Sequence, residues 1–156
     1  FRSFLEGESR EAGTFFAAIA KEIQTYGNPV KAPCVLISSG ETTTRIPDNS
    51  AVSGHGGPGQ ELTVGFAIAA SGADGCCMLS IDSEGTDGTT DVAGGLTDSQ
   101  TFRLALEKGI DLHASLRRHA CYEALHQIGD TVFTGNTGTN LCDLNILYVP
   151  EKNKID

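Results

Sequence analysis

Apolar residues recur along the chain at spacings typical of helices and strands. Residues 9–26 carry apolar side chains three and four positions apart, which predicts an amphipathic helix ended by Gly27, Asn28 and Pro29. Residues 59–72 are apolar on nearly every side and follow Pro58, which suits a first helical turn, so we expect a second, heavily buried helix. Two more helices are predicted over residues 101–109 and 111–129, the latter a single long helix capped by Asp111.

Short runs of β-branched and large apolar residues predict the strands. They lie at residues 32–39, 76–82 and 144–149, with residues 41–46 as a further strand or a continuation of the first. Helices alternate with strands, so the predicted fold is α/β, a layered domain with a mixed β-sheet flanked by helices. Residues 1–156 show neither an internal repeat nor an interdomain linker, which predicts a single domain.

Composition narrows the possible partners. A formal net charge of −9 argues against nucleic acid, although backbone amides or a cation can still bind a phosphorylated small molecule. No stretch has the apolar length of a membrane span, and the start does not resemble a signal peptide. Five cysteines without a CxxC pair predict free thiols in a reducing compartment, the cytoplasm. Because the chain begins with Phe1, we expect it to be the C-terminal domain of a longer protein.

The first candidate loop is GHGGPG, Gly54 to Gly59. It matches G-x-G-x-x-G, but no clear strand precedes it, which weakens a nicotinamide site. A glycine-rich loop entering a helix also presents free amides to phosphate or carboxylate, and His55 could contact such an anion. A plain connector with a solvated histidine is the equal alternative.

The second loop is the acidic run DSEGTDGTTDVAGG, residues 82–95. Glu84, Asp87 and Asp91 could together bind a hard cation such as Mg²⁺. Alternatively, these carboxylates cap the turn and the helix that follows through bonds to backbone amides. The residues leave both interpretations open.

The third loop is TGNTGTN, Thr134 to Asn140. Its glycines allow close backbone approach to a ligand and its hydroxyls can form hydrogen bonds, although simple turns explain it equally well. Each loop lies after a predicted strand or before a predicted helix, where α/β proteins gather their ligands. The three loops together therefore favour a binding site.

The order of the motifs resembles a known family. EGESREAGTFFAAIAKEI, LISSGETTT, GHGGPGQEL, EGTDGTTDVAGG and FTGNTGTNLCDLNILYV follow one another as in the MOFRL domain. This domain is the C-terminal half of class II glycerate kinases, some of which are named hydroxypyruvate reductases. The resemblance implies ATP-dependent phosphorylation of D-glycerate with Mg²⁺, in a cleft shared with an N-terminal Rossmann-like domain that this chain lacks.

The resemblance also assigns residues to that cleft. Glu84, Asp87 and Asp91 would hold the metal. The substrate and phosphate would be bound by the turn after the first strand, the glycine loop with the helix start, and the last loop, that is, by Ser39, Gly40, Glu41, His55, Gly56, Gly57, Gln60, Glu61, Gly135, Thr137, Gly138, Thr139 and Asn140.

This chain departs from the family pattern at three places. Where the family has Gly-Gly-Arg-Asn-Gln-Glu, this chain has Pro58 and Gly59 in place of Arg-Asn. The usual Thr-Asp is Ser83-Glu84, and the usual Asn-Asp-Ser-Tyr is residues 119–122, read HACY. A lost arginine with retained acids favours a non-catalytic binding or regulatory module, whereas the retained Thr-Gly-Thr-Asn favours part of a glycerate kinase. A hydroxypyruvate reductase is the third hypothesis. Under each, we expect the isolated domain to be inactive.

Overall fold

The computed structural model describes residues 2–46 and 52–152, so residues 47–51 of the predicted loop before the second helix lie outside the described part. In that part a six-stranded sheet has the order β1-β2-β6-β3-β4-β5. Its strands are β1 (Arg2–Leu5), β2 (Cys34–Gly40), β3 (Cys77–Asp82), β4 (Gly94–Asp98), β5 (Thr131–Val132) and β6 (Asp143–Val149). β1 pairs with β2 in parallel and the other pairs are antiparallel, which confirms the predicted mixed α/β sheet.

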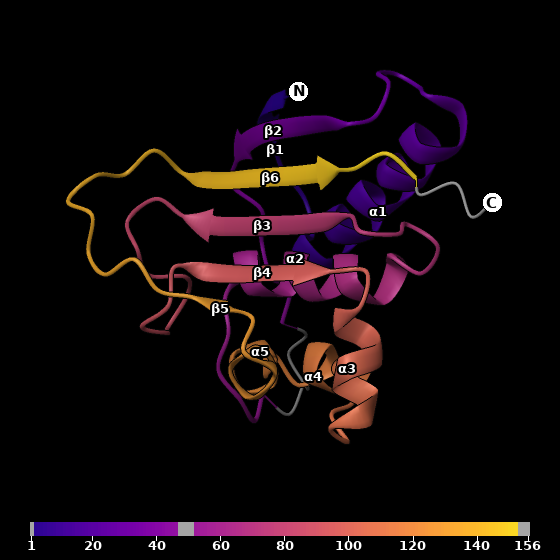
Figure 1. The fold of residues 1–156 in the computed structure, drawn as a ribbon. Coiled ribbons are helices and arrows are strands. Elements are labelled where there is room, and N and C mark those ends of the chain that lie inside the picture. Colours follow the sequence, from indigo (N-terminus) through magenta and orange to yellow (C-terminus); the bar gives the residue numbers. More distant parts are fainter. Residues whose placement is uncertain (1, 47–51, 153–156) are drawn as a thin grey trace.

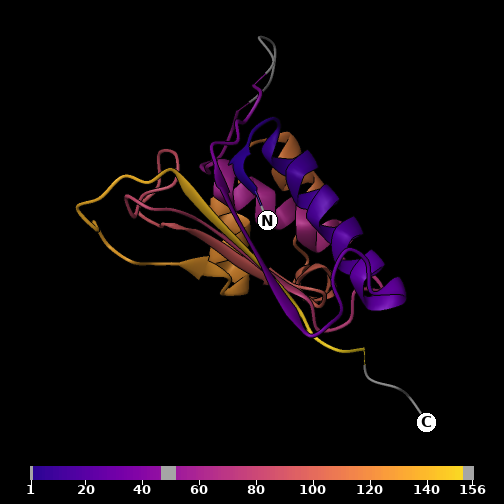
Figure 2. The ribbon, with the colours of Figure 1, turned by 90° about the horizontal axis from the view of Figure 1, so that it is seen from above.

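Two helices cover one face of the sheet. α1 (Ser9–Tyr26) and α2 (Pro58–Ala69) lie behind the strands in Figure 1 and on one side of them in Figure 2. Their apolar side chains pack against alternate strand residues, so that Phe16, Phe66, Met78 and Leu147 form one buried core. Every residue of α2 from Gly59 to Ala67 is buried, as expected for a helix that is apolar on nearly every side, and the polar Gln60, Glu61 and Thr63 are buried with the rest.

The remaining helices build a second core beyond β4 and β5. α3 (Thr101–Glu107), α4 (Leu112–Arg117) and α5 (Cys121–Ile128) gather at the lower end of the sheet in Figure 1. Leu112, Cys121 and Leu125 pack there against Val64 and Ala67 of α2. Because α2 contributes to both cores, it ties the two halves of the domain together.

Two of the predicted elements are wrong. The single helix over residues 111–129 is broken between α4 and α5, where His119 adopts a positive φ of 53° and its side chain bonds Glu61 of α2. Residues 41–46 form only one isolated bridge, between Thr43 and Glu8, instead of a strand. This segment is fastened to the chain start, since the Ser9 amide donates to the Thr43 carbonyl over 2.9 Å.

The sheet brings the candidate loops to one edge. Gly40 at the end of β2 and Asp82 at the end of β3 both lie opposite Asp143, the first residue of β6. The segments that leave β2 and β3, and the one that enters β6, therefore meet at the left-hand edge of the sheet in Figure 1.

Candidate functional site

A pocket of about 300 Å³ lies at this edge, between the strand ends and the start of α2. It joins residues from all three candidate loops, and besides Asp87 its lining includes four carboxylates. The lining consists of Glu41, Thr42, Pro58, Asp82, Glu84, Asp87, Gly88, Asn140, Cys142 and Asp143. Sequence reasoning had identified Glu41, Glu84, Asp87 and Asn140 as site residues, and the structure brings these together.

Asp87 is buried beneath the pocket and caps α2 from a distance in sequence. Its two carboxylate oxygens accept hydrogen bonds from the Gly59 amide (3.1 Å) and the Gln60 amide (2.8 Å), and the Gln60 side chain donates a third (3.0 Å). Burial raises the Asp87 pKa, and these donors partly offset that effect. The first free amides of α2 are thus already satisfied within the domain.

The acidic loop and the glycine loop touch backbone to backbone. Gly88 has a φ of 63°, and a Cβ there would lie 2.3 Å from the Gly56 carbonyl oxygen. Only glycine permits this approach without a shift of one loop. The approach holds Asp87 against the start of α2.

Asp143 is the most perturbed carboxylate of the pocket. It is 8 % exposed, and its Oδ2 accepts a long hydrogen bond of 3.4 Å from the Thr42 amide. Its pKa is raised to about 6, chiefly by burial and also by the charges of Asp87, Asp82 and Glu41, while the bond from Thr42 acts against this rise. The pocket therefore concentrates negative charge and binds protons more readily than separate carboxylates would.

The last loop closes one side of the pocket. The Asn140 amide donates to the Glu84 carboxylate, and the Thr137 hydroxyl donates to the Ser83 carbonyl. An adjoining hollow is lined by Glu84, Asn140, Gly138 and Thr139 among others. The acidic run and the polar loop predicted separately thus form one wall.

The predicted metal ligands do not converge. Asp87 is committed to α2, Glu84 bonds Asn140, and Asp91 lies in a separate hollow with His55 and Tyr122. Within residues 2–46 and 52–152, no group of three or more His, Cys, Asp or Glu side chains is arranged to hold a metal ion. The three carboxylates are therefore not a complete ligand set within this domain.

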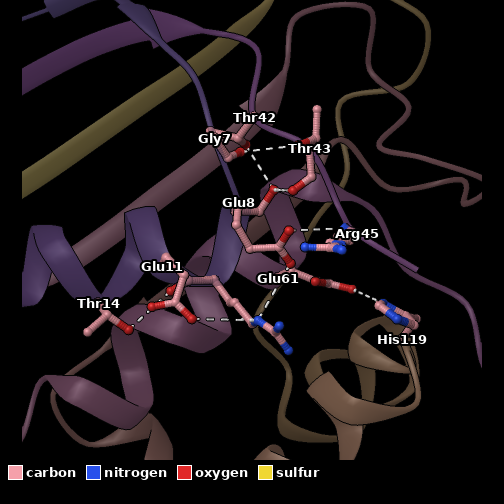
Figure 3. A network of polar contacts seen from close by, with 11 residues as sticks. Gly7, Glu8, Glu11, Thr14, Thr42, Thr43, Arg45, Glu61 and His119 are labelled. Carbon is pink, nitrogen blue, oxygen red and sulfur yellow. Dashed lines mark hydrogen bonds and ion pairs between the residues drawn. The ribbon is translucent and has the colours of Figure 1, made fainter. Parts of the chain in front are cut away.

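Glu61 points away from the acidic pocket toward His119. It is 1 % exposed, its Oε1 lies 2.7 Å from His119 Nδ1, and its Oε2 has no hydrogen-bond partner (Figure 3). Burial raises the Glu61 pKa, and the bond and charge of His119 partly offset this. A mostly apolar hollow lined by Ile46 and Val52 lies beside this pair.

Other predicted residues lie around the pocket and do not line it. Gly56 and Gly57 border the hollow beside Glu61, and His55 pairs with the Glu123 carboxylate at 2.8 Å. Ser39 and Gly40 belong to β2, Gln60 faces inward, and Gly135 precedes the wall-forming part of its loop. The binding roles of all these residues stay predictions.

Six lining residues were not among the predicted site residues: Thr42, Pro58, Asp82, Gly88, Cys142 and Asp143. Asp82 and Asp143 flank predicted strands, and a carboxylate beside a strand end was the available signal. Their proximity depends on β3 and β6 being neighbours, which is a property of strand order.

The comparisons with known proteins agree with this geometry. Residues 34–143 match the model of the MOFRL family, and the chain belongs to that family. It is 41% identical over 148 residues to a glycerate 2-kinase of Pyrococcus horikoshii, a match that covers 95% of this chain and 33% of that protein. It is 42% identical over 142 residues to a D-glycerate 2-kinase of Thermotoga maritima, covering 91% of this chain and 33% of that protein.

The fold is also that of a solved glycerate kinase. The crystal structure of the Thermotoga maritima glycerate kinase superposes with a TM-score of 0.89 at 39% identity, over 96% of this chain and 35% of that one. The chain thus spans about a third of the length of these relatives. Within the described residues, no helix has the length and apolar character needed to cross a membrane.

Proposed function

We propose that this chain is the C-terminal domain of a glycerate kinase and forms one wall of a cleft in which ATP phosphorylates D-glycerate. A Rossmann-like N-terminal domain supplies the opposite wall. The observation that carries the proposal is the acidic pocket, which draws one wall from the β2 turn, the α2 start, the acidic run and the last loop. The relatives' names supply the substrate.

The negative charge of the pocket means that ATP can bind there only together with cations. A cluster of carboxylates repels the phosphates of ATP unless cations lie between them. Mg²⁺ suits this arrangement, because it is commonly bound by one or two carboxylates together with phosphate oxygens and water. Glu84, which reaches the pocket and keeps one carboxylate oxygen outside its bond to Asn140, is the residue we assign to Mg²⁺.

In this proposal the domain's own residues position the cation and the start of α2. Glu84 would hold the cation, and Asn140 orients that carboxylate by its hydrogen bond. Asp87 fixes the start of α2 and so the position of Pro58 on the rim. The five free cysteines are consistent with a reducing, cytoplasmic location.

The reductase hypothesis loses its main support. Dinucleotide sites place a pyrophosphate on the free amides of a helix start, and in α2 the amides of Gly59 and Gln60 already bind the Asp87 carboxylate. A non-catalytic module remains the second candidate, favoured by Pro58 at the position of the family's arginine.

A chimera tests the proposal. This chain would replace the matching third of the Thermotoga maritima D-glycerate 2-kinase, and ATP-dependent phosphorylation of D-glycerate would be measured with Mg²⁺. We expect turnover from the chimera, a loss of at least tenfold in Glu84→Ala, and no turnover from the 156-residue chain alone, which lacks the opposite wall.

Pro58→Arg in the same chimera distinguishes a catalytic glycerate kinase domain from a non-catalytic module. A guanidinium on the pocket rim can contact two phosphate oxygens, so we expect turnover to rise about tenfold or more. Gly59 should be kept, because a Cβ there would lie 3.2 Å from the Ser80 carbonyl oxygen. A folded chimera that stays inactive with and without the arginine would identify this chain as a binding or regulatory module.

A further inference from the structure

One face of the sheet is apolar although no part of the two helical cores packs on it. The strand registers align the middle residues of four strands in one row, Ile37, Ile146, Leu79 and Leu96. The row on one side continues with Val35, Tyr148 and Cys77, and the row on the other side contains Leu144 and Ile81. We call this surface the open face.

The alternation of exposure confirms which side these residues occupy. Met78, Leu147 and Val149 are fully buried against α1 and α2, whereas their strand neighbours Tyr148 and Val35 are 40 % and 53 % exposed. Figure 1 shows the sheet with α1 and α2 behind it, so the open face is turned toward the viewer. A contiguous apolar surface of this kind on a folded domain marks an interaction site.

We propose that the open face is a dimer interface, on which a second copy of this chain packs sheet to sheet. The proposal is independent of catalytic activity. The acidic pocket lies at the strand ends, where the opposite wall of a cleft would face it. The most exposed residues of the open face, Val35 and Leu96 among them, lie two to five residues back from that edge and on the face itself. A domain that packed on this edge alone would leave the open face available to a second copy.

The open face is where two copies can meet with the least charge repulsion. Two chains that each carry a net charge of −9 repel one another across most of their surfaces. Among the aligned positions of β2, β6, β3 and β4 on the open face, Asp98 is the charged residue, and its carboxylate already accepts hydrogen bonds from the Gln100 and Thr101 amides. Two copies can therefore meet here with almost no apposed carboxylates.

The size of the face suits the centre of a modest dimer. With a strand spacing of about 4.8 Å and a two-residue repeat of about 6.8 Å, four strands and three rows cover roughly 20 Å by 20 Å. Stable interfaces bury about 800 Å² on each partner, so the rim must supply the remainder and we expect a dissociation constant on the order of 10 μM. Face-to-face sheets of this kind pack with their strands about 30° apart.

Sedimentation velocity on the 156-residue chain tests the proposal, after circular dichroism has shown each sample to be folded. The parent should pass from monomer to dimer between about 1 and 200 μM, and Leu96→Lys should shift that transition at least tenfold higher. The matched control is Leu106→Lys, which adds the same charge at an exposed leucine of α3 and should dimerise like the parent. If Leu96→Lys does not fold, Val35→Lys replaces it.

A chemical measurement on the unaltered chain provides a second test. Cys77 lies on the open face and Cys142 lies exposed at the acidic pocket. Alkylation of Cys77, mapped by peptide mass, should slow several-fold in the concentrated sample, while Cys142 reacts at an unchanged rate. A chain that stays monomeric, an unaffected Leu96→Lys dimer, or an unprotected Cys77 overturns the proposal. Protection of Cys77 only in the chimera would assign the face to the rest of a longer chain.

Discussion

The environment of Asp143, and with it the pKa of its side chain, depends on the order of the strands in the sheet. Its neighbours Asp82 and Glu41 are distant in sequence and are brought beside it by the pairing of β6 with β3 and β2. Burial raises the Asp143 pKa from 3.8 to about 6. The folded state therefore binds a proton at Asp143 more tightly than the unfolded chain does, so this residue costs stability as pH rises from 3.8 through about 6.

We expect Asp143→Asn to stabilise the domain above this range. At pH 8 the free energy of unfolding should rise by about 2 kcal/mol, because the amide keeps an acceptor for the Thr42 N–H and carries no buried charge. Urea titrations from pH 3 to pH 8 measure the effect, and the gain should shrink toward zero at the acidic end.

The control is Asp111→Asn, for which the expected change in the free energy of unfolding has the opposite sign. Its carboxylate accepts a hydrogen bond from the Ala114 amide at the start of α4, and this bond lowers the Asp111 pKa. That variant should lose stability at neutral pH and approach the parent in acid. Equal pH profiles for the two variants would contradict the assigned environment of Asp143.

At the scale of elements, α2 depends on a loop from elsewhere in the chain. Its own N-cap is Gly57, which offers no side chain, and the capping oxygens come from Asp87. Remote capping is expected to be strong here because the carboxylate is buried and accepts several donors at once.

We predict that Asp87→Ala lowers the free energy of unfolding by about 2–3 kcal/mol, since it leaves buried amides without an acceptor. Asp91→Ala, which removes an exposed acid of the same loop, should change it by less than about 0.5 kcal/mol. Denaturation without added metal measures both. If Asp87→Ala is as stable as the parent and differs from it only when Mg²⁺ is present, the residue serves as a metal ligand and not as a cap.

Helices and strands with a regular spacing of apolar residues were predictable from the sequence. Those whose bounds depend on contacts with distant residues were not. The positions of α1, α2, β3 and β6 follow from apolar spacing that each segment carries itself. The break at His119 was not readable, because local propensity continues through it and the competing contact is with Glu61, 58 residues away. β4 was also missed, since Gly94 and Gly95 read as a loop until β3 pairs with them.

In the candidate site, too, some residues were predictable from the sequence and others were not. Glu84 and Asn140 were predictable because glycine-rich polar loops beside strand ends gather ligands in α/β folds. Capping by the acidic run was one of two open alternatives, but it was predicted for its own turn and the helix that follows, whereas Asp87 caps α2, which precedes it in the chain. The inward orientation of Gln60 and Glu61 was not predictable, since a helix that is apolar on all sides gives no indication of which side faces a cleft.

At the scale of the whole molecule, α2 joins two cores that would otherwise be separate. Leu62 and Phe66 pack with α1 and the sheet, while Val64 and Ala67 pack with α4 and α5. Loosening one core therefore removes support from the helix that the other requires. This arrangement favours a single cooperative unit, as expected for a small domain.

We predict that α1 and α5 lose their amide protection at the same urea concentration, and that Val64→Ala shifts both by the same amount. Val64 is fully buried and belongs to the core around α4 and α5, so the lost methyl groups should cost about 2 kcal/mol. Hydrogen exchange read by mass spectrometry follows the two helices separately in one sample. Leu106→Ala, at a side chain 59 % exposed, is the control and should shift neither. If Val64→Ala weakens α5 while α1 keeps its parental midpoint, the two cores unfold independently, and α2 does not couple the acidic pocket to the helices beyond it.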